Sequence, residues 1–107
     1  MKFDESYEFL TDMYEDSYFP KKLTDKVKNH IKQAVAALEQ GQKEPKKVQK
    51  IFDKMTLAIN RLMPEFEAAG SELETAARDC VATDVMYILD WFGLDLDVED
   101  ALRERDF

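Results

Sequence analysis

The chain has 107 residues, 45% of them hydrophobic and 36% charged, with a formal net charge of −8 at pH 7. This length fits one core, and the apolar share is too high for a disordered chain. The acidic balance argues against nucleic acid and anionic membranes as partners, and three Gly and three Pro are too few for the turns of a sheet protein. We therefore expect a single all-α domain over residues 1–107.

The first twenty residues predict one short helix followed by a break. Aromatic and aliphatic residues recur there at spacings of four, three and four: Phe3, Tyr7, Leu10 and Tyr14. This is the period of one helix face, so we expect a helix from about Asp4 to Asp16. Pro20 favours a break before it, because the residue preceding a proline is pushed out of the helical conformation.

Two longer helices follow, joined by a short polar loop. The first begins at Pro20 or Thr24 and carries an apolar face made of Leu23, Val27, Ile31, Ala34 and Leu38. Gly41 can adopt the left-handed conformation that ends a helix, and Pro45 suits the first position of the next helix. So short a connection predicts that the two helices lie antiparallel.

The third predicted helix has the cleanest apolar stripe of the chain. Its members share one side of a helical wheel: Val48, Ile51, Phe52, Met55, Ile59, Leu62, Met63, Phe66 and Ala69. Pro64 interrupts the stripe in sequence but lies on the opposite side of the wheel. We therefore predict one helix kinked at Pro64 rather than two helices.

The fourth predicted helix begins with a capping pattern. Gly70 ends the third helix, and Ser71 with Glu74 forms the S-x-x-E pattern of a capping box at the start of the fourth. The residues expected to face inward are Leu73, Ala76, Ala77, Cys80, Val81, Ile88, Trp91 and Phe92. Their period predicts a long helix packed against the core.

Gly93 ends the fourth helix, and a short fifth helix is expected from about Asp97 to Glu104 with Asp97 as its cap. The tail beyond Arg105 is expected to fray. The predicted fold is therefore all-α: an irregular bundle of four helices, with helix three kinked at Pro64, plus a short C-terminal helix.

Charge is unevenly distributed along the chain. Residues 1–20 carry a net charge of −5, residues 21–54 carry +6 and residues 55–107 carry −9. The ten lysines of the basic segment either pair with acidic helices of the same bundle, which the sequence favours, or form a patch for an anionic partner. The acidic faces suit a basic protein surface.

Catalytic and metal-binding motifs are absent from the sequence. His30 is the only histidine, which argues against a di-iron bundle and against a zinc site, so we expect no metal and no cofactor. The sequence predicts that Cys80 is a small core residue and that the protein occupies a reducing compartment. It has no apolar leader and no apolar run long enough to span a membrane, which predicts a cytoplasmic protein.

Four carboxylates lie close together in the sequence and could hold a hard cation: Glu65, Glu67, Glu72 and Glu74. We instead expect them to cap helix ends and to interact with the helix dipole.

Asp84 is the anomalous residue of the fourth helix. On a helical wheel it falls within about 40° of the centre of the apolar face, between Cys80 and Ile88. An unpaired buried carboxylate is unfavourable, so we expect Asp84 to be paired, to be protonated, or to line a wet cleft, and the sequence favours a buried hydrogen-bonded pair with a Tyr, Lys or Arg over a functional cleft. In a wet cleft, Asp84 would bind a ligand together with nearby aromatic residues: Tyr87, Trp91, Tyr14 and Tyr18.

Two stretches of the chain carry a family resemblance. Residues 13–20 (MYEDSYFP) and residues 65–78 (EFEAAGSELETAAR), together with the length, resemble a family of small bacterial all-helical proteins known only as a domain of unknown function. The likeness covers most of the chain and is least distinctive in the Lys-rich middle. It implies a small bacterial cytoplasmic protein, and it brings no activity, cofactor or site.

Two functions stay open on the sequence alone. The first is a protein–protein interaction or regulatory module, because no catalytic constellation is present and the charges are segregated. Its partner would be a basic protein surface or a second copy of the chain. The second is a small enzyme or ligand-binding protein with a site around Asp84. The sequence favours the first.

Overall fold

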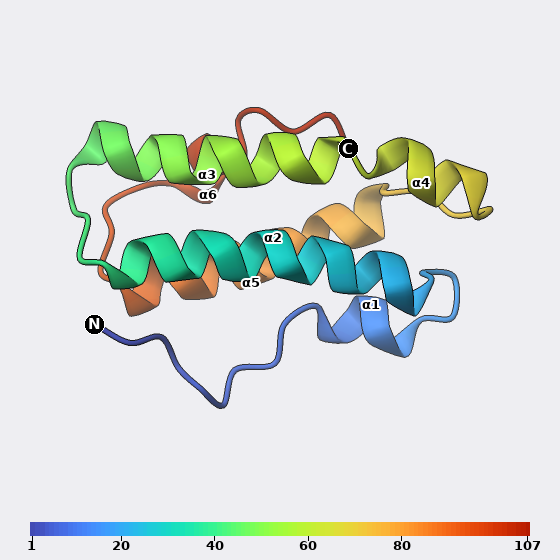
Figure 1. The fold of residues 1–107 in the computed structure, drawn as a ribbon, viewed down its shortest axis with the longest axis horizontal. Helices are drawn as coiled ribbons and strands as arrows, with labels where there is room; N and C mark the ends of the chain where they lie inside the picture. The colour runs from blue at the N-terminus through green and yellow to red at the C-terminus, as the bar shows by residue number, and fades with distance from the viewer.

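Six helices and no strand make up the computed structural model, which describes residues 1–107 (Figure 1). Three of the helices are long: α2 (Lys21–Glu39), α3 (Pro45–Asn60) and α5 (Thr75–Trp91). The other three are short: α1 (Thr11–Glu15), α4 (Met63–Ala68) and α6 (Val98–Ala101). The predicted all-α fold is confirmed.

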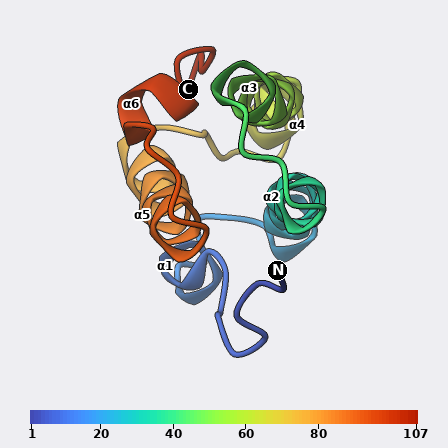
Figure 2. The same ribbon diagram turned by 90° about the vertical axis from the view of Figure 1, so that its left-hand side faces the viewer.

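The helices form two layers, seen end-on in Figure 2. The antiparallel pair α2 and α3 makes one layer, and α5 makes the other together with α1 and α6. The Cα atoms span 39 × 28 × 18 Å, so the molecule is a flattened slab. A cluster of 27 buried hydrophobic residues fills the space between the layers, with Ile31, Phe52 and Val81 fully enclosed.

The boundaries of α2 and α3 lie at the proline and glycine residues from which they were predicted. Helix α2 begins directly after Pro20, and Pro45 is the first residue of α3. Gly41 has a φ of 91°, in the left-handed region that a residue with a Cβ adopts only at a cost. Glycine is therefore the residue type that suits this turn of the polar loop between the helices.

The predicted bend in the third helix is confirmed, and the break lies at residues 61–62. Helix α3 ends at Asn60, and α4 continues in nearly the same direction (Figure 1). Asn60 lies four residues before Pro64, so its carbonyl is the one that a proline ring obstructs and leaves without a helical donor. Pro64 is exposed and Phe66 is buried, which keeps the apolar stripe in phase across the break.

The predicted capping box at Ser71 is wrong. The backbone N–H of Ser71 donates to the Phe66 carbonyl at 2.8 Å and that of Gly70 to the Glu67 carbonyl at 3.0 Å, the pair of bonds that closes a helix C-terminus around a left-handed glycine. Helix α5 begins four residues later, with Glu74 preceding it and no side-chain cap. The Ser71 backbone therefore closes α4 rather than starting α5. The Oγ atom of Ser71 is buried and has no hydrogen-bond partner.

Replacing Ser71 with alanine should leave the free energy of unfolding unchanged or raise it by up to about 1 kcal/mol, because a buried hydroxyl without a partner is destabilising. Denaturant melts measure the change. Thr56→Val is the matched control, since the buried Thr56 Oγ1 donates to the Phe52 carbonyl at 2.7 Å. That variant should lose stability, and a comparable loss in Ser71→Ala would contradict the geometry described here.

The N-terminal helix is much shorter than predicted. Instead of running from Asp4 to Asp16, the helical segment is limited to Thr11–Glu15, and the residues before it cross the molecule as turns and extended chain. Leu10 has a φ of 55°, the only positive φ outside glycine, which breaks any continuous helix at that point. The predicted apolar period is real, but packing rather than helix formation accounts for it.

The C-terminal tail is held in place, so the predicted fraying is wrong. Phe107 is 7% exposed within the core cluster. Asn60 clamps the tail, because its Nδ2 donates to the Glu104 carbonyl at 2.7 Å and its Oδ1 accepts from the Asp106 N–H at 2.9 Å. The cap of α6 is as predicted, with Asp97 accepting a bond from the Glu99 N–H.

Candidate functional site

The Asp84 carboxylate is buried at the interface between α5 and the N-terminal segment, with 3% of the residue exposed. Its Oδ1 accepts a hydrogen bond from the Tyr7 hydroxyl at 2.6 Å, and its Oδ2 accepts one from the Leu10 backbone N–H at 2.9 Å. Neither a lysine nor an arginine pairs with it. Of the predicted environments, the structure therefore shows the enclosed carboxylate with a tyrosine partner.

The second of these bonds holds a strained piece of backbone. Leu10 precedes the first turn of α1 in the left-handed conformation, which is costly for a residue with a branched side chain. Asp84 accepts a hydrogen bond from the Leu10 N–H, although the two residues are 74 positions apart in the sequence. The carboxylate thus joins α5 to the start of α1 and fixes the direction in which the N-terminal segment runs.

Burial raises the pKa of Asp84, while the bonds from Tyr7 and Leu10 oppose that rise. Removal from water disfavours the ionised form, whereas hydrogen bonds from donors favour it. Both oxygens are engaged by donors of the same chain, and the residue lines neither of the two grooves described below. Chemically, Asp84 is placed to accept hydrogen bonds within the fold.

Tyr7, the tyrosine partner of Asp84, belongs to an aromatic cluster between the N-terminal segment and α5. Phe3 lies at its centre, with five ring centroids between 5.7 and 5.9 Å away: Tyr7, Phe9, Tyr87, Trp91 and Phe92. Tyr7 also stacks on Tyr87 at 4.2 Å. Two of the predicted ligand-binding residues, Tyr87 and Trp91, therefore lie together in the cluster that includes the partner of Asp84.

Polar atoms at the edge of the cluster tie it to the first residues of the chain. The Tyr87 hydroxyl donates to Asp4 Oδ2 at 2.6 Å, and this bond is the main cause of the raised pKa of Tyr87. The Trp91 Nε1 donates to the Lys2 carbonyl at 3.0 Å. Trp91 was predicted to face inward and is instead 36% exposed, because its ring covers the N-terminal segment from outside.

The outer face of α5 carries a shallow apolar groove, which we call the α5 groove. Met86 is 57% exposed and Tyr87 is 36% exposed. The groove has a volume of about 660 Å³ and is lined by Tyr7, Thr83, Met86, Tyr87, Leu89, Asp90, Leu94, Leu96, Asp97 and Val98. Seven of these ten residues are hydrophobic, and the only charges among them are two carboxylates.

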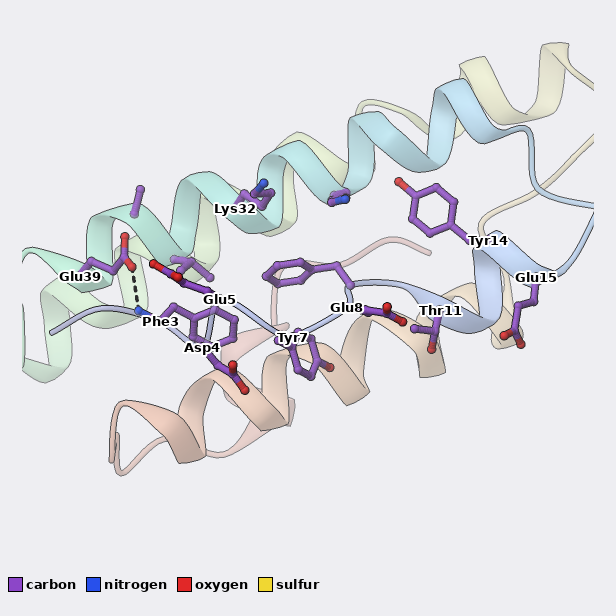
Figure 3. Close-up of a pocket in the computed structure, with 14 residues that line it drawn as sticks. Phe3, Asp4, Glu5, Tyr7, Glu8, Thr11, Tyr14, Glu15, Lys32 and Glu39 are labelled. Atoms are coloured by element: carbon purple, nitrogen blue, oxygen red, sulfur yellow. Dashed lines mark hydrogen bonds between the residues drawn. The ribbon is translucent and has the colours of Figure 1, made fainter.

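A second and larger groove, the N-terminal groove, lies between the N-terminal segment and α2 (Figure 3). Its volume is about 870 Å³, and its charged residues are five acids and two lysines: Asp4, Glu5, Glu8, Glu15, Glu39, Lys28 and Lys32. Glu39 closes one end by accepting a bond from the Phe3 N–H at 2.7 Å. Figure 3 shows Glu15 turned away from the other acids, and no group of three metal-ligating side chains occurs in the protein.

The other two predicted ligand-binding residues do not join Asp84. Tyr14 lines the N-terminal groove, and its hydroxyl donates to Asp25 on α2. Tyr18 is 41% exposed in the turn before α2 and packs edge-on against Phe19. Of the predicted set, only Tyr87 and Trp91 therefore belong to the aromatic cluster that contains Tyr7, the partner of Asp84.

The two layers differ in charge. Helices α2 and α3 carry nine lysines against three acids, whereas α1, α5 and α6 carry one arginine against seven acids. Only three ion pairs occur: Lys26–Glu65, Lys47–Glu44 and Arg103–Asp53. The prediction that the lysines of residues 21–54 pair with acidic helices is therefore wrong for all but Lys26. The basic charge remains on the surface.

The sequence did not single out Tyr7 or Leu10 as neighbours of Asp84. Tyr7 was placed on a helix face, where its hydroxyl would have no reason to reach α5. The one available signal was the mismatch between the buried position of Asp84 and the lack of a basic residue on its own helix face. That mismatch required a donor from elsewhere, without indicating which.

Comparison with known proteins gives one match. A family model described as "Family of unknown function (DUF5713)" covers residues 3–107. No curated protein and no solved structure matches the chain. None of the helices is both long and apolar enough to cross a membrane.

Proposed function

The chain belongs to this family of unknown function, and we propose that it is a protein–protein interaction module whose α5 groove binds a basic amphipathic segment of another protein. The observation that carries the proposal is the exposed apolar lining of that groove, with Met86 standing 57% exposed above it. Its acidic surroundings supply the complementary charge. The buried Cys80 supports a reducing compartment such as the cytoplasm.

The apolar lining of the groove and its acidic surroundings both favour a basic amphipathic partner. Methionine and aromatic side chains are enriched at interfaces, where flexible thioether chains adapt to a partner and aromatic rings supply large contact areas. Asp90 and Asp97 line the groove, and the layer that contains it is acidic overall. Complementary charge steers a basic segment toward the surface and disfavours an acidic one.

Asp84 supports this surface from beneath. It fixes Tyr7, which stacks on Tyr87, and both tyrosines line the α5 groove. A groove whose wall is held by a buried hydrogen bond needs little reorganisation when a partner binds, which lowers the entropic cost of association. In this proposal Asp84 positions the binding surface and does not contact the partner.

A short helical peptide of leucine and lysine is the probe that tests the proposal. Calorimetric titration should show binding that weakens as salt is added, because the acidic face and the lysines attract one another through screened charges. A peptide with serine in place of every leucine should bind at least about tenfold more weakly, since it keeps the charge and loses the apolar contact.

Met86→Ser should weaken binding of the leucine–lysine peptide by about tenfold or more, because truncating a central apolar anchor commonly has that effect. Leu57→Ser is the matched control, since Leu57 is 41% exposed on α3 in the basic layer. Equal binding by wild type and Met86→Ser would contradict the assignment of the groove. Equal losses in both variants would show that the peptide binds apolar surface without selectivity.

A second copy of the chain is the competing occupant, because its own α2–α3 layer is basic. The acidic and basic layers lie on opposite sides of the slab (Figure 2). Contacts between unlike faces repeat from copy to copy and produce rings or open filaments rather than a twofold dimer. Salt-sensitive growth of large assemblies in light scattering would therefore identify self-association in place of a different partner.

A further inference from the structure

The surface of the basic layer contains a pocket with a chemistry unlike that of the two grooves. It lies between α2 and α3, has a volume of about 450 Å³, and is lined by His30, Gln33, Ala34, Ala37, Lys50, Ile51, Lys54, Met55, Ala58 and Arg61. We call it the α2–α3 pocket. It is on the opposite layer from the α5 groove, so nothing inferred about it rests on the proposed function.

The lining divides into an apolar part and a polar part. Alanine, isoleucine and methionine side chains make half of it, and the other half consists of one glutamine and four side chains that are basic. No carboxylate lines the pocket, whereas five line the N-terminal groove. Three of the basic side chains, Lys50, Lys54 and Arg61, are cationic and repel one another unless an anion lies among them.

None of the five polar side chains has a partner within the protein. His30, Gln33, Lys50, Lys54 and Arg61 make no side-chain hydrogen bond and no ion pair. Lys26, one turn before His30 on α2, does find a carboxylate, Glu65. The fold therefore neutralises a lysine beside the pocket and leaves those in the pocket free.

Helix geometry explains how these groups converge. Residues three or four apart lie on the same face of a helix. The pocket takes residues 30, 33, 34 and 37 from α2 and residues 50, 51, 54, 55, 58 and 61 from α3 and the residue after it, so one face of each antiparallel helix supplies it. Ala34 and Met55 at its floor are buried in the core, whereas Lys50, Lys54 and Arg61 are exposed.

A merely solvated lysine face does not account for this arrangement. Lys22 and Lys46 are exposed lysines of the same two helices, and they line none of the cavities described. The pocket differs from their surroundings because it combines basic groups with a partly exposed apolar surface. Small-molecule sites are typically cavities of about 300–1,000 Å³ with a mostly apolar lining and a few polar groups that fix the orientation of the ligand.

We propose that the α2–α3 pocket binds a small amphipathic anion, with its apolar body on the half-buried surface of Ala37, Ile51 and Ala58 and its carboxylate or phosphate head among the basic side chains. Lys50 and Lys54 approach the head from α3, Arg61 from the position directly after α3, and His30 from α2. Arginine and lysine bind both head groups through charge-assisted hydrogen bonds.

The imidazole of His30 provides a readout inside the pocket. Burial, and then the positive charge of Arg61, lower the pKa of His30. A bound anion opposes the second effect, so saturation with ligand should raise this pKa. His30 is the only histidine, which makes its ring proton signals in NMR spectra unambiguous.

Four probes test the proposal on the full chain: decanoate below its micelle-forming concentration, decyl phosphate, decanol and inorganic phosphate. Decanoate or decyl phosphate should bind saturably and raise the pKa of His30, and the better of the two identifies the head group. Decanol and inorganic phosphate should each bind at least about tenfold more weakly, because each lacks half of the required chemistry. Equal binding of decanol, or equal binding of inorganic phosphate, would overturn the proposal.

A pair of double variants controls for overall charge. Lys50→Gln with Lys54→Gln should weaken binding of the better probe by about tenfold or more, whereas Lys22→Gln with Lys46→Gln removes the same charge and should leave binding within about twofold of wild type. Equal losses in the two double variants would show general electrostatic attraction and would contradict a built pocket. The absence of saturable binding by either anionic probe would contradict it as well.

Discussion

Replacing Asp84 with leucine should lower the free energy of unfolding by about 2–4 kcal/mol, because it leaves two donors without an acceptor. The buried Leu10 N–H loses its only acceptor, Asp84 Oδ2. The partly buried Tyr7 hydroxyl loses its acceptor as well, which is Asp84 Oδ1. Leucine is bulkier than aspartate and accepts no hydrogen bond. The strained conformation of Leu10 would then have nothing to hold it.

Asp84→Asn should cost less than Asp84→Leu, because its amide oxygen can still accept from Leu10 and the Tyr7 hydroxyl can turn to accept from the amide nitrogen. No basic side chain pairs with Asp84, so the substitution leaves no uncompensated positive charge. Urea melts of the two variants beside wild type measure the difference. A leucine variant more stable than wild type would show that Asp84 is kept at the expense of the fold.

The pH dependence of this comparison has a definite sign. Burial raises the pKa of Asp84 above its unfolded value of about 3.9, so the folded chain binds more protons than the unfolded chain between the two values. Wild type therefore loses stability as the pH rises through that window, and the asparagine variant has no such group to titrate. The stability gap between them should be widest in acid and narrow toward neutral pH. A gap that widens with pH would contradict the raised pKa.

Phe3→Ala should lower the free energy of unfolding by about 3–5 kcal/mol, the usual cost of removing a buried phenylalanine side chain. Phe3 is 7% exposed although it is the third residue of the chain. Five aromatic rings converge on it, from the N-terminal segment and from α5 with the residue that follows α5. Its removal should loosen the whole first segment.

Tyr18→Ala is the matched control for that experiment, because Tyr18 is an aromatic residue 41% exposed at the surface. Its loss should change the stability by no more than about 0.5 kcal/mol. Thermal melts of both variants, with hydrogen exchange of residues 3–10, measure the effect. Similar small changes in the two would show that the N-terminal segment contributes little to the fold.

The long helices could be predicted because their signals are local. An apolar period repeated over four or five turns, ended by Gly41, Gly70 and Gly93, places α2, α3 with α4, and α5 within a few residues. The bend was predicted from Pro64, although its position depends on the Asn60 carbonyl four residues earlier. These features depend on neighbours in sequence.

The termini could not be predicted, since distant contacts decide them. The period from Phe3 to Tyr14 is that of a helix, yet the bond from Leu10 to Asp84 holds the backbone in the left-handed region. Likewise, the last residues are ordered by Asn60, more than 40 positions earlier. Tertiary contacts of this kind override local preference and leave no periodic trace.

The candidate site was predictable in part for the same reason. The helical wheel places Asp84 on the buried face, and the structure shows it there with 3% exposed. Its partner could not be inferred, because Tyr7 was assigned to a helix that does not form. The α5 groove depends on residues 94–98 lying beside the helix they follow, which is a matter of chain direction after Gly93.

The central claim is that the partner binds at the α5 groove and that Asp84 supports this groove from within. Titration of the leucine–lysine peptide into Asp84→Asn and Met86→Ser, at a temperature where both are folded, tests it most directly. We predict that Asp84→Asn binds within about twofold of wild type and that Met86→Ser binds at least about tenfold more weakly. Binding lost in Asp84→Asn and kept in Met86→Ser would contradict the account, because it would place the partner at the carboxylate.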